Sequence, residues 1–159
     1  TKDDLIERVF KEVYLNWIQP NWASELRDRS TPLEERLVNY YTSYAKVVHG
    51  YEWVRIYMFS GLSGNSMNRR YIRIVEDEFL KPMCEEIRAH CDLPDSNEYP
   101  ITPLELERIW VMHGGFFYYA IRKNIFHSKV HTDFKSIVAS TVKVMIEGAR
   151  AMSPEDLRT

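Results

Sequence analysis

The chain has 159 residues, of which 45% are hydrophobic and 28% are charged. This balance is typical of one globular domain and excludes a disordered chain. The formal net charge of −2 argues against a surface that binds nucleic acid by releasing counterions. The sequence contains neither a signal peptide nor a run of eighteen apolar residues, so we expect no membrane association.

The two cysteines predict free thiols. Cys84 and Cys91 are seven residues apart, which is roughly 10 Å along a helix and too far for a disulfide. Free thiols suit the reducing cytoplasm, where we expect this protein to be. His127 and His131 are spaced for metal chelation if helical, but they fall in an expected linker, so we predict no metal site.

The first helix is predicted from residue 1 to about residue 18. Thr1 is a capping residue, and Asp4 takes the capping-box position. Apolar residues then recur at helical spacing from Leu5 onward, and Pro20 ends or kinks the segment.

A second helix is predicted from the Thr31-Pro32 start signal to Gly50, with Thr31 as its cap and Glu34 completing the capping box. A third helix is predicted over 51–62. It is apolar on most sides, which is typical of a central, buried helix.

Three more helices follow. One is predicted over 66–91, with Pro82 kinking it, and 92–101 is a loop. The next is capped by Thr102 and ends at about Asn124. The last is capped by Thr132 and ends at about residue 151, and a polar tail starts at Ser153. No alternating β-branched run is present, so the fold is predicted to be all-α, with about six helices in one domain over 1–159.

Aromatic residues are unusually abundant, with ten Tyr, seven Phe and four Trp. Many fall on the expected inner faces of the helices, where each buried hydroxyl or indole N–H needs a partner. Such side chains favour a cavity with aromatic walls for a small molecule. A compact core whose tyrosine hydroxyls reach the surface is equally compatible with this pattern.

Adjacent glycines interrupt the fifth helix at Gly114 and Gly115, and each costs about 1 kcal/mol relative to Ala. A close helix neighbour or a kink would explain them. His113 beside them is either a core histidine or a ligand contact. The last helix carries apolar and small residues at steps of three and four, which suit packing against partner helices or burial within one chain.

The segments Thr1-Lys2-Asp3-Asp4-Leu5, 31–37 and 104–115 resemble, in their order and spacing, the effector-binding and dimerisation domain of TetR-type transcriptional regulators of bacteria. The resemblance covers nearly the whole chain, but the helix-turn-helix that precedes this domain in the family is absent. Residues 1–18 would then be the helix that links to a missing DNA-binding head.

The resemblance implies a homodimer whose last two helices form an intersubunit four-helix bundle. It implies a small, mostly apolar effector that alters DNA binding by the full-length protein, with no cofactor. The expected ligand-binding residues are Tyr14, Trp17, Tyr44, Val48, Trp53, Tyr57, Tyr71, Trp110, His113 and Phe117. The expected dimer interface comprises Gly114, Gly115, Tyr118, Val138, Met145 and Gly148.

Other functions remain alternatives. An enzyme is disfavoured because the sequence has no nucleophile elbow, phosphate-binding loop or His-Glu-x-x-His motif. A helical dimerisation or interaction module without a ligand would have a fully packed interior. A lipid-carrier-like protein would have a cavity but no seam between chains.

Overall fold

The computed structural model describes the chain except residues 17, 65, 158 and 159, and the described part is helical without strands. This confirms the all-α prediction, with seven helical rods where about six were predicted. The first rod is α1 (Lys2–Phe10), which continues into the π-helical turn η1 (Lys11–Leu15). Three single helices follow: α2 (Trp22–Arg27), α3 (Leu33–Val48) and α4 (Tyr51–Leu62). The fifth rod consists of α5 (Met67–Val75), the π-helical turn η2 (Glu76–Leu80) and α6 (Lys81–His90), and the last two are α7 (Pro103–Asn124) and α8 (Phe134–Arg150). A short 3-10 turn, η3 (Pro154–Leu157), follows α8.

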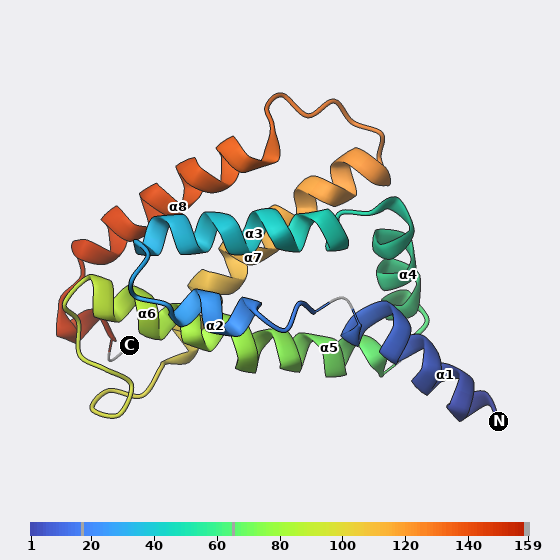
Figure 1. Cartoon of the computed structure of the whole chain (residues 1–159), viewed down its shortest axis with the longest axis horizontal. Coiled ribbons are helices and arrows are strands. Elements are labelled where there is room, and N and C mark those ends of the chain that lie inside the picture. Colours follow the sequence, from blue (N-terminus) through green and yellow to red (C-terminus); the bar gives the residue numbers. More distant parts are fainter. Residues whose placement is uncertain (17, 65, 158–159) are drawn as a thin grey trace.

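The long helix α3 organises the core. It lies across the middle of the molecule, with α8 along one side, the α5–α6 rod along the other and α7 behind it (Figure 1). Leu37 and Tyr41 of α3 have no exposed surface, and the Tyr41 ring packs edge-on against Phe116 of α7 at 4.6 Å between centroids. The N-terminus and α4 lie at one end of the molecule, and the end of α8 lies at the other (Figure 1).

Several predicted boundaries are confirmed. Thr1 caps α1 in a capping box with Asp4, and the first rod ends before Pro20. Helix α4 spans the predicted residues, and α7 begins after the Thr102 cap and ends at Asn124. Cys84 is free, as is the second cysteine of the chain.

Two predicted caps are wrong. Pro32 rather than Thr31 precedes the first turn of α3, and no side chain caps that helix. Asp133 rather than Thr132 caps α8, because its carboxylate accepts a hydrogen bond from the Ser136 backbone N–H. In both cases the N-cap residue lies one position later in the chain than predicted.

Two buried elements lie where the sequence predicted none. The six residues of α2 are too few to show a helical period, yet Trp22 and Leu26 are buried and the Trp22 indole donates to the Ser43 hydroxyl. The expected polar tail contains η3, whose Leu157 is 2% exposed.

The expectation that α4 is a central, buried helix is also wrong. Only Trp53, Val54 and Ser60 of this helix are buried, whereas Phe59 and Leu62 are 75% and 85% exposed. Helix α4 closes one end of the molecule (Figure 1), so one side faces the core and the other faces solvent.

Pro82 lies in a continuous rod, as predicted. The wider turn η2 precedes it, and the Lys81 backbone N–H donates to the Glu76 carbonyl across five residues. This turn accommodates a proline, which cannot donate a backbone hydrogen bond within the helix. No helix of the described residues is both long enough and apolar enough to cross a bilayer.

Candidate ligand-binding site

A cavity of about 140 Å³ lies between α3, α4, α5 and α7. Helices that cross at this point contribute large side chains from four parts of the chain, and these rings leave a space between them. The residues that line it are Tyr44, Trp53, Tyr57, Tyr71, Ile72, Val75, Trp110, His113, Gly114 and Phe117. We call this space the central cavity.

Seven of the ten residues expected to bind a ligand line the central cavity: Tyr44, Trp53, Tyr57, Tyr71, Trp110, His113 and Phe117. Tyr14 lies directly behind the wall, with its ring 5.1 Å from that of Tyr71. Val48 is 2% exposed and belongs to the core rather than to the cavity wall. Trp17 lies outside the described residues.

Ile72, Val75 and Gly114 also line the central cavity but were not expected to do so. Val75 follows Tyr71 by four residues, so helical spacing could have identified it. Gly114 was assigned to the dimer interface alone. Ile72 is 37% exposed and Gly114 is also exposed, so the cavity lies close to the protein surface on their side.

Aromatic rings in mutual contact form most of the wall. Trp53 and Tyr57 stack at 5.1 Å, and Phe117 meets Tyr57 edge-on at the same separation. Tyr71 meets Trp53 edge-on at 5.5 Å. Edge-on and stacked contacts of this kind stabilise ring clusters beyond the effect of burial alone, so they hold the wall in a defined shape.

Two polar groups meet at the cavity. The Tyr44 hydroxyl lies 3.3 Å from Nε2 of His113. His113 is 5% exposed, and its Nδ1 has no hydrogen-bond partner among the described residues. Burial, with a smaller contribution from His49, lowers the pKa of His113 to about 4. The imidazole is therefore neutral at pH 7 and has one donor and one acceptor nitrogen.

No lining residue of the central cavity is ionised at neutral pH. Burial raises the pKa of Tyr57 and of Tyr71 above the ordinary value, and His113 is neutral. An uncharged ligand therefore suits this environment, since burying an unpaired charge is costly. An apolar cavity of about 150 Å³ is large enough for benzene, so the central cavity in this conformation suits a molecule with a single ring.

The cavity wall contacts the first rod directly. The Trp53 indole N–H donates to the Val13 carbonyl of η1 at 2.8 Å. The Tyr14 ring lies against three lining residues, Trp53, Tyr57 and Tyr71. A movement of the wall therefore changes contacts with the N-terminal rod.

An ion pair attaches the same rod to α5. Arg70, next to the lining residue Tyr71, pairs with Glu7 of α1 through two bonds of 2.7 and 3.1 Å. The Arg70 guanidinium also lies 4.0 Å from the centroid of the Phe10 ring. Helices α1 and α5 are thus connected beside the central cavity.

The residues expected at a dimer interface divide into two groups. Gly114, Gly115, Tyr118 and Gly148 are exposed, and Met145 is half-buried. Val138 was assigned wrongly, because it is 0% exposed and packs inside its own chain. Helix α8 packs chiefly on α3, and its buried residues are Val138, Val142, Ile146 and Ala149.

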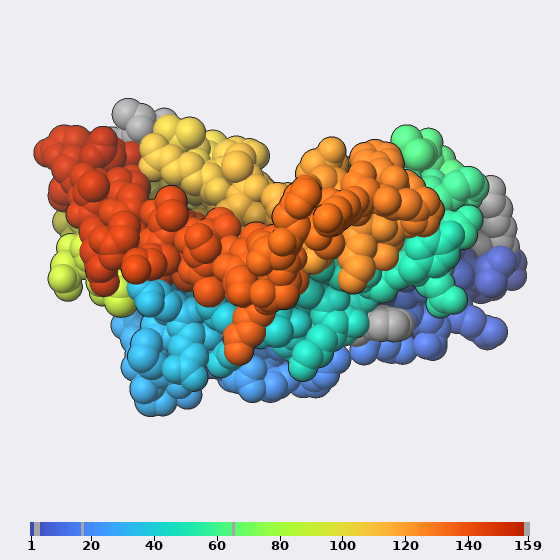
Figure 2. All heavy atoms as spheres, turned by 90° about the horizontal axis from the view of Figure 1, so that it is seen from above, coloured from blue at the N-terminus to red at the C-terminus, as the bar shows by residue number. Residues whose placement is uncertain are grey.

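The outer face of α7 carries exposed apolar residues that were only partly predicted. Leu104, Val111 and Tyr118 are 44%, 76% and 51% exposed and recur every seven residues. Gly114 and Gly115 lie between them, and a Cβ on either glycine would meet nothing within 4 Å. Figure 2 shows a hollow in the surface between the beginning of α7, in yellow, and its end, in orange. No close contact with the described part of the chain therefore requires glycine at these two positions.

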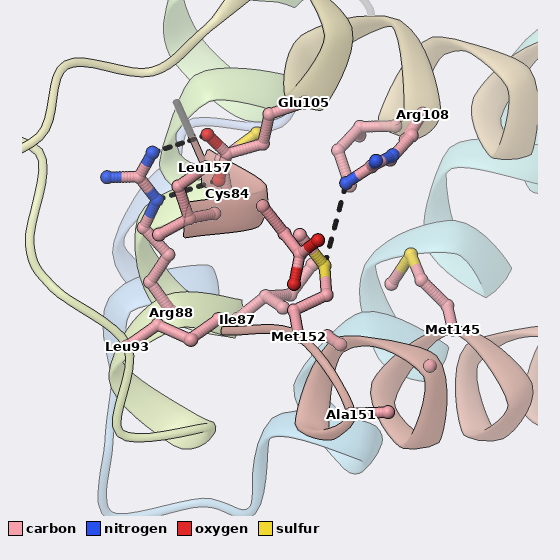
Figure 3. A pocket seen from close by; sticks show the side chains of 14 residues that line it. Cys84, Ile87, Arg88, Leu93, Glu105, Arg108, Met145, Ala151, Met152 and Leu157 are labelled. Carbon is pink, nitrogen blue, oxygen red and sulfur yellow. Dashed lines mark hydrogen bonds and ion pairs between the residues drawn. The ribbon is translucent and has the colours of Figure 1, made fainter. Parts of the chain in front are cut away.

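A second cavity of about 440 Å³ lies where α6, the beginning of α7 and the end of α8 meet (Figure 3). This cavity was not predicted from the sequence. Apolar side chains such as Ile87, Ile109 and Leu157 form much of its wall, and Gly148 leaves room beside them. Burial raises the pKa of the Cys84 thiol, another lining residue, to about 12, so this thiol stays neutral and unreactive at pH 7.

Within the described residues, no group of three or more His, Cys, Asp or Glu side chains is arranged to hold a metal ion. Comparison with protein-family models, with curated proteins and with solved structures found no match for this chain.

Proposed function

We propose that this chain is the effector-sensing and dimerisation domain of a TetR-type transcriptional regulator. The central cavity binds a small, uncharged and mostly apolar molecule, and binding alters how the full-length protein engages DNA. One observation carries the proposal: seven residues that were chosen from sequence pattern and family resemblance lie around one cavity. These residues come from four separate helices and surround one space, as a ligand-binding site requires.

The contacts between the cavity and the first rod supply a route for the signal. A ligand that displaces Trp53 or Tyr71 disturbs the hydrogen bond to Val13 and the ring contacts of Tyr14. The ligand shifts the equilibrium only by the difference in its affinity for the two arrangements. A DNA-binding head attached to α1 would move with this rod, and the spacing between two heads must match about 34 Å of DNA for tight binding.

Exposed apolar side chains near the N-terminus support a neighbouring domain at that end. Leu5 of α1 is 62% exposed, and Phe59 and Leu62 of α4 are more exposed still. Both helices lie at the end of the molecule that carries the N-terminus (Figure 1). Clustered apolar side chains of this kind are typical of interaction surfaces. We assign this surface to contact with the head.

The exposed face of α7 supports the homodimer. Two helices can approach closely where both present glycine, and the heptad spacing of Leu104, Val111 and Tyr118 suits packing at a shallow angle. The two glycines, each costing about 1 kcal/mol in a helix, are then explained by the close approach of a second chain. In this proposal α7 and α8 of each chain form the four-helix bundle.

Calorimetric titration with phenol, benzyl alcohol and toluene tests the cavity assignment. We expect at least one of these single-ring probes to bind, and both Trp110→Ala, which removes a wall, and Phe117→Trp, which fills the space, to abolish binding. Phe126→Ala removes a 59% exposed ring outside the cavity and should bind as the wild type does.

The Trp110→Ala variant should remain a dimer by light scattering, because Trp110 faces the cavity and not the outer face of α7. Binding that survives both cavity variants would contradict the assignment. No binding of any probe, together with no compound retained in native mass spectrometry of the purified protein, would favour the alternative of a dimerisation module without a ligand.

A further inference from the structure

The wall of the central cavity includes a buried polar atom that the described residues leave without a partner. His113 lines this cavity and is 5% exposed, and its Nδ1 makes no hydrogen bond with any of these residues. An unpaired polar group inside a protein costs more free energy than an ordinary hydrogen bond contributes. Such atoms are few in native structures, and each one calls for a physical explanation.

The contact with Tyr44 determines which nitrogen of the imidazole carries the hydrogen. The Tyr44 hydroxyl lies 3.3 Å from Nε2 of His113. A phenol hydroxyl is the better donor and an imidazole nitrogen is the more basic acceptor, so Tyr44 donates to Nε2. His113 is neutral at pH 7, because burial lowers its pKa to about 4, and a neutral imidazole has a single N–H. That hydrogen is therefore on Nδ1, which is a donor without an acceptor.

The aromatic side chains around the His113 ring supply no acceptor to Nδ1. The Tyr41 ring lies 5.8 Å away between centroids, and its hydroxyl donates to the Met83 thioether at 3.4 Å. The Trp110 ring meets the imidazole edge-on at 5.5 Å, and an indole has a donor but no acceptor. The central cavity is the adjoining space in which a bound molecule can supply the acceptor.

We propose that the ligand of the central cavity is an uncharged aromatic carbonyl compound, whose oxygen accepts a hydrogen bond from the Nδ1–H of His113. Its ring lies among Trp53, Tyr57 and Phe117, which form the apolar part of the wall. A carbonyl oxygen satisfies the buried N–H without the cost of burying an ion, whereas a hydrocarbon would leave this N–H unpaired. The inference rests on the ligand-binding role proposed above and specifies the chemistry of the ligand.

Calorimetric titration of the whole chain with acetophenone and α-methylstyrene tests the proposal. The two probes have the same shape, and a CH₂ group of the second replaces the carbonyl oxygen of the first. His113→Gln keeps an amide near the position of Nε2 but places none at Nδ1, whereas His113→Asn keeps one near Nδ1. We expect the ratio of acetophenone affinity to α-methylstyrene affinity to fall about tenfold in His113→Gln and to stay near the wild-type value in His113→Asn. His131→Gln changes an exposed histidine and should not alter this ratio.

A second readout needs no variant, because a hydrogen-bonded carbonyl absorbs infrared light at a lower wavenumber than a free one. The carbonyl band of bound acetophenone should therefore lie below its position in hexane. An unshifted band, or a ratio that is unchanged in His113→Gln, refutes the hydrogen bond. An equal fall of the ratio in both His113 variants also refutes it, because the two then differ from the wild type only in packing. If neither probe binds, the ligand-binding role fails together with this inference; if both bind with the same ratio in every variant, the inference alone fails.

Discussion

The Arg88–Glu105 pair offers a sharp test of how this fold is held together. Glu105→Gln keeps the size of the side chain but removes its charge and replaces one acceptor oxygen with an NH₂ donor. Arg88, at 1% exposure, is then left as a buried cation without its counter-charge. Its bonds to the Pro94 and Tyr99 carbonyls supply dipoles but no compensating charge.

The expected loss is large. Removing one partner of a buried ion pair costs about 3–5 kcal/mol, out of a total free energy of unfolding of roughly 5–15 kcal/mol. In a chain of this length each kcal/mol lowers Tm by about 2–4 °C, so Tm should fall by about 6–20 °C. Arg88→Met combined with Glu105→Leu replaces the pair by apolar groups and should cost much less than Glu105→Gln alone.

Urea unfolding followed by circular dichroism at pH 7 measures these differences. Glu107→Gln is the matched control, because Glu107 is an exposed acid on the same helix and should change stability by less than about 0.5 kcal/mol. A Glu105→Gln variant as stable as the control would refute the reasoning. So would a double variant less stable than Glu105→Gln.

Three further predictions concern the core, the thiols and the outer face of α7. His113 has a folded-state pKa of about 4, below the value of about 6.5 in an unfolded chain, so only the unfolded chain takes up this proton between pH 6.5 and 4. Stability should fall by up to about 3 kcal/mol in this window, and His113→Phe should flatten that part of the curve of unfolding free energy against pH; an unchanged slope would contradict the buried, neutral imidazole. Cys91, which is half-buried, should react with a disulfide reagent in the native state before Cys84, which is 1% exposed, and equal rates would contradict the packing around Cys84. Gly114→Leu should give a monomer or an aggregate by light scattering, whereas Ala89→Leu at an exposed position of α6 should not; a normal dimer for the Gly114 variant would remove this residue from the interface.

Helical spacing explains why much of the central cavity could be predicted. Tyr44 and Tyr71 fall on inner faces because their helices are amphipathic, and large rings on facing helices converge. The same spacing does not distinguish burial within a chain from burial between chains. For that reason Val138 was placed at an interface although it packs within its own chain.

Tertiary contacts that leave no local pattern account for the rest. The second cavity joins residues such as Ile87, Ile109 and Leu157, which come together only after three segments have packed. The apolar composition of α4 predicted a buried helix, but the position of a helix at the end of a bundle depends on its neighbours. The short α2, with Trp22 buried, is too brief for a period of 3.6 residues to be visible.

Adjacent residues of α7 belong to two different chambers, since Ile109 faces the second cavity and Trp110 faces the central one. Successive residues point about 100° apart around a helix, so one rigid rod forms part of both walls. A roll of this rod that enlarges the central cavity for a phenol would narrow the second cavity. A phenol in the central cavity and any molecule in the second cavity would then compete without sharing an atom of their sites, and by reciprocity each would weaken the affinity of the other by the same factor.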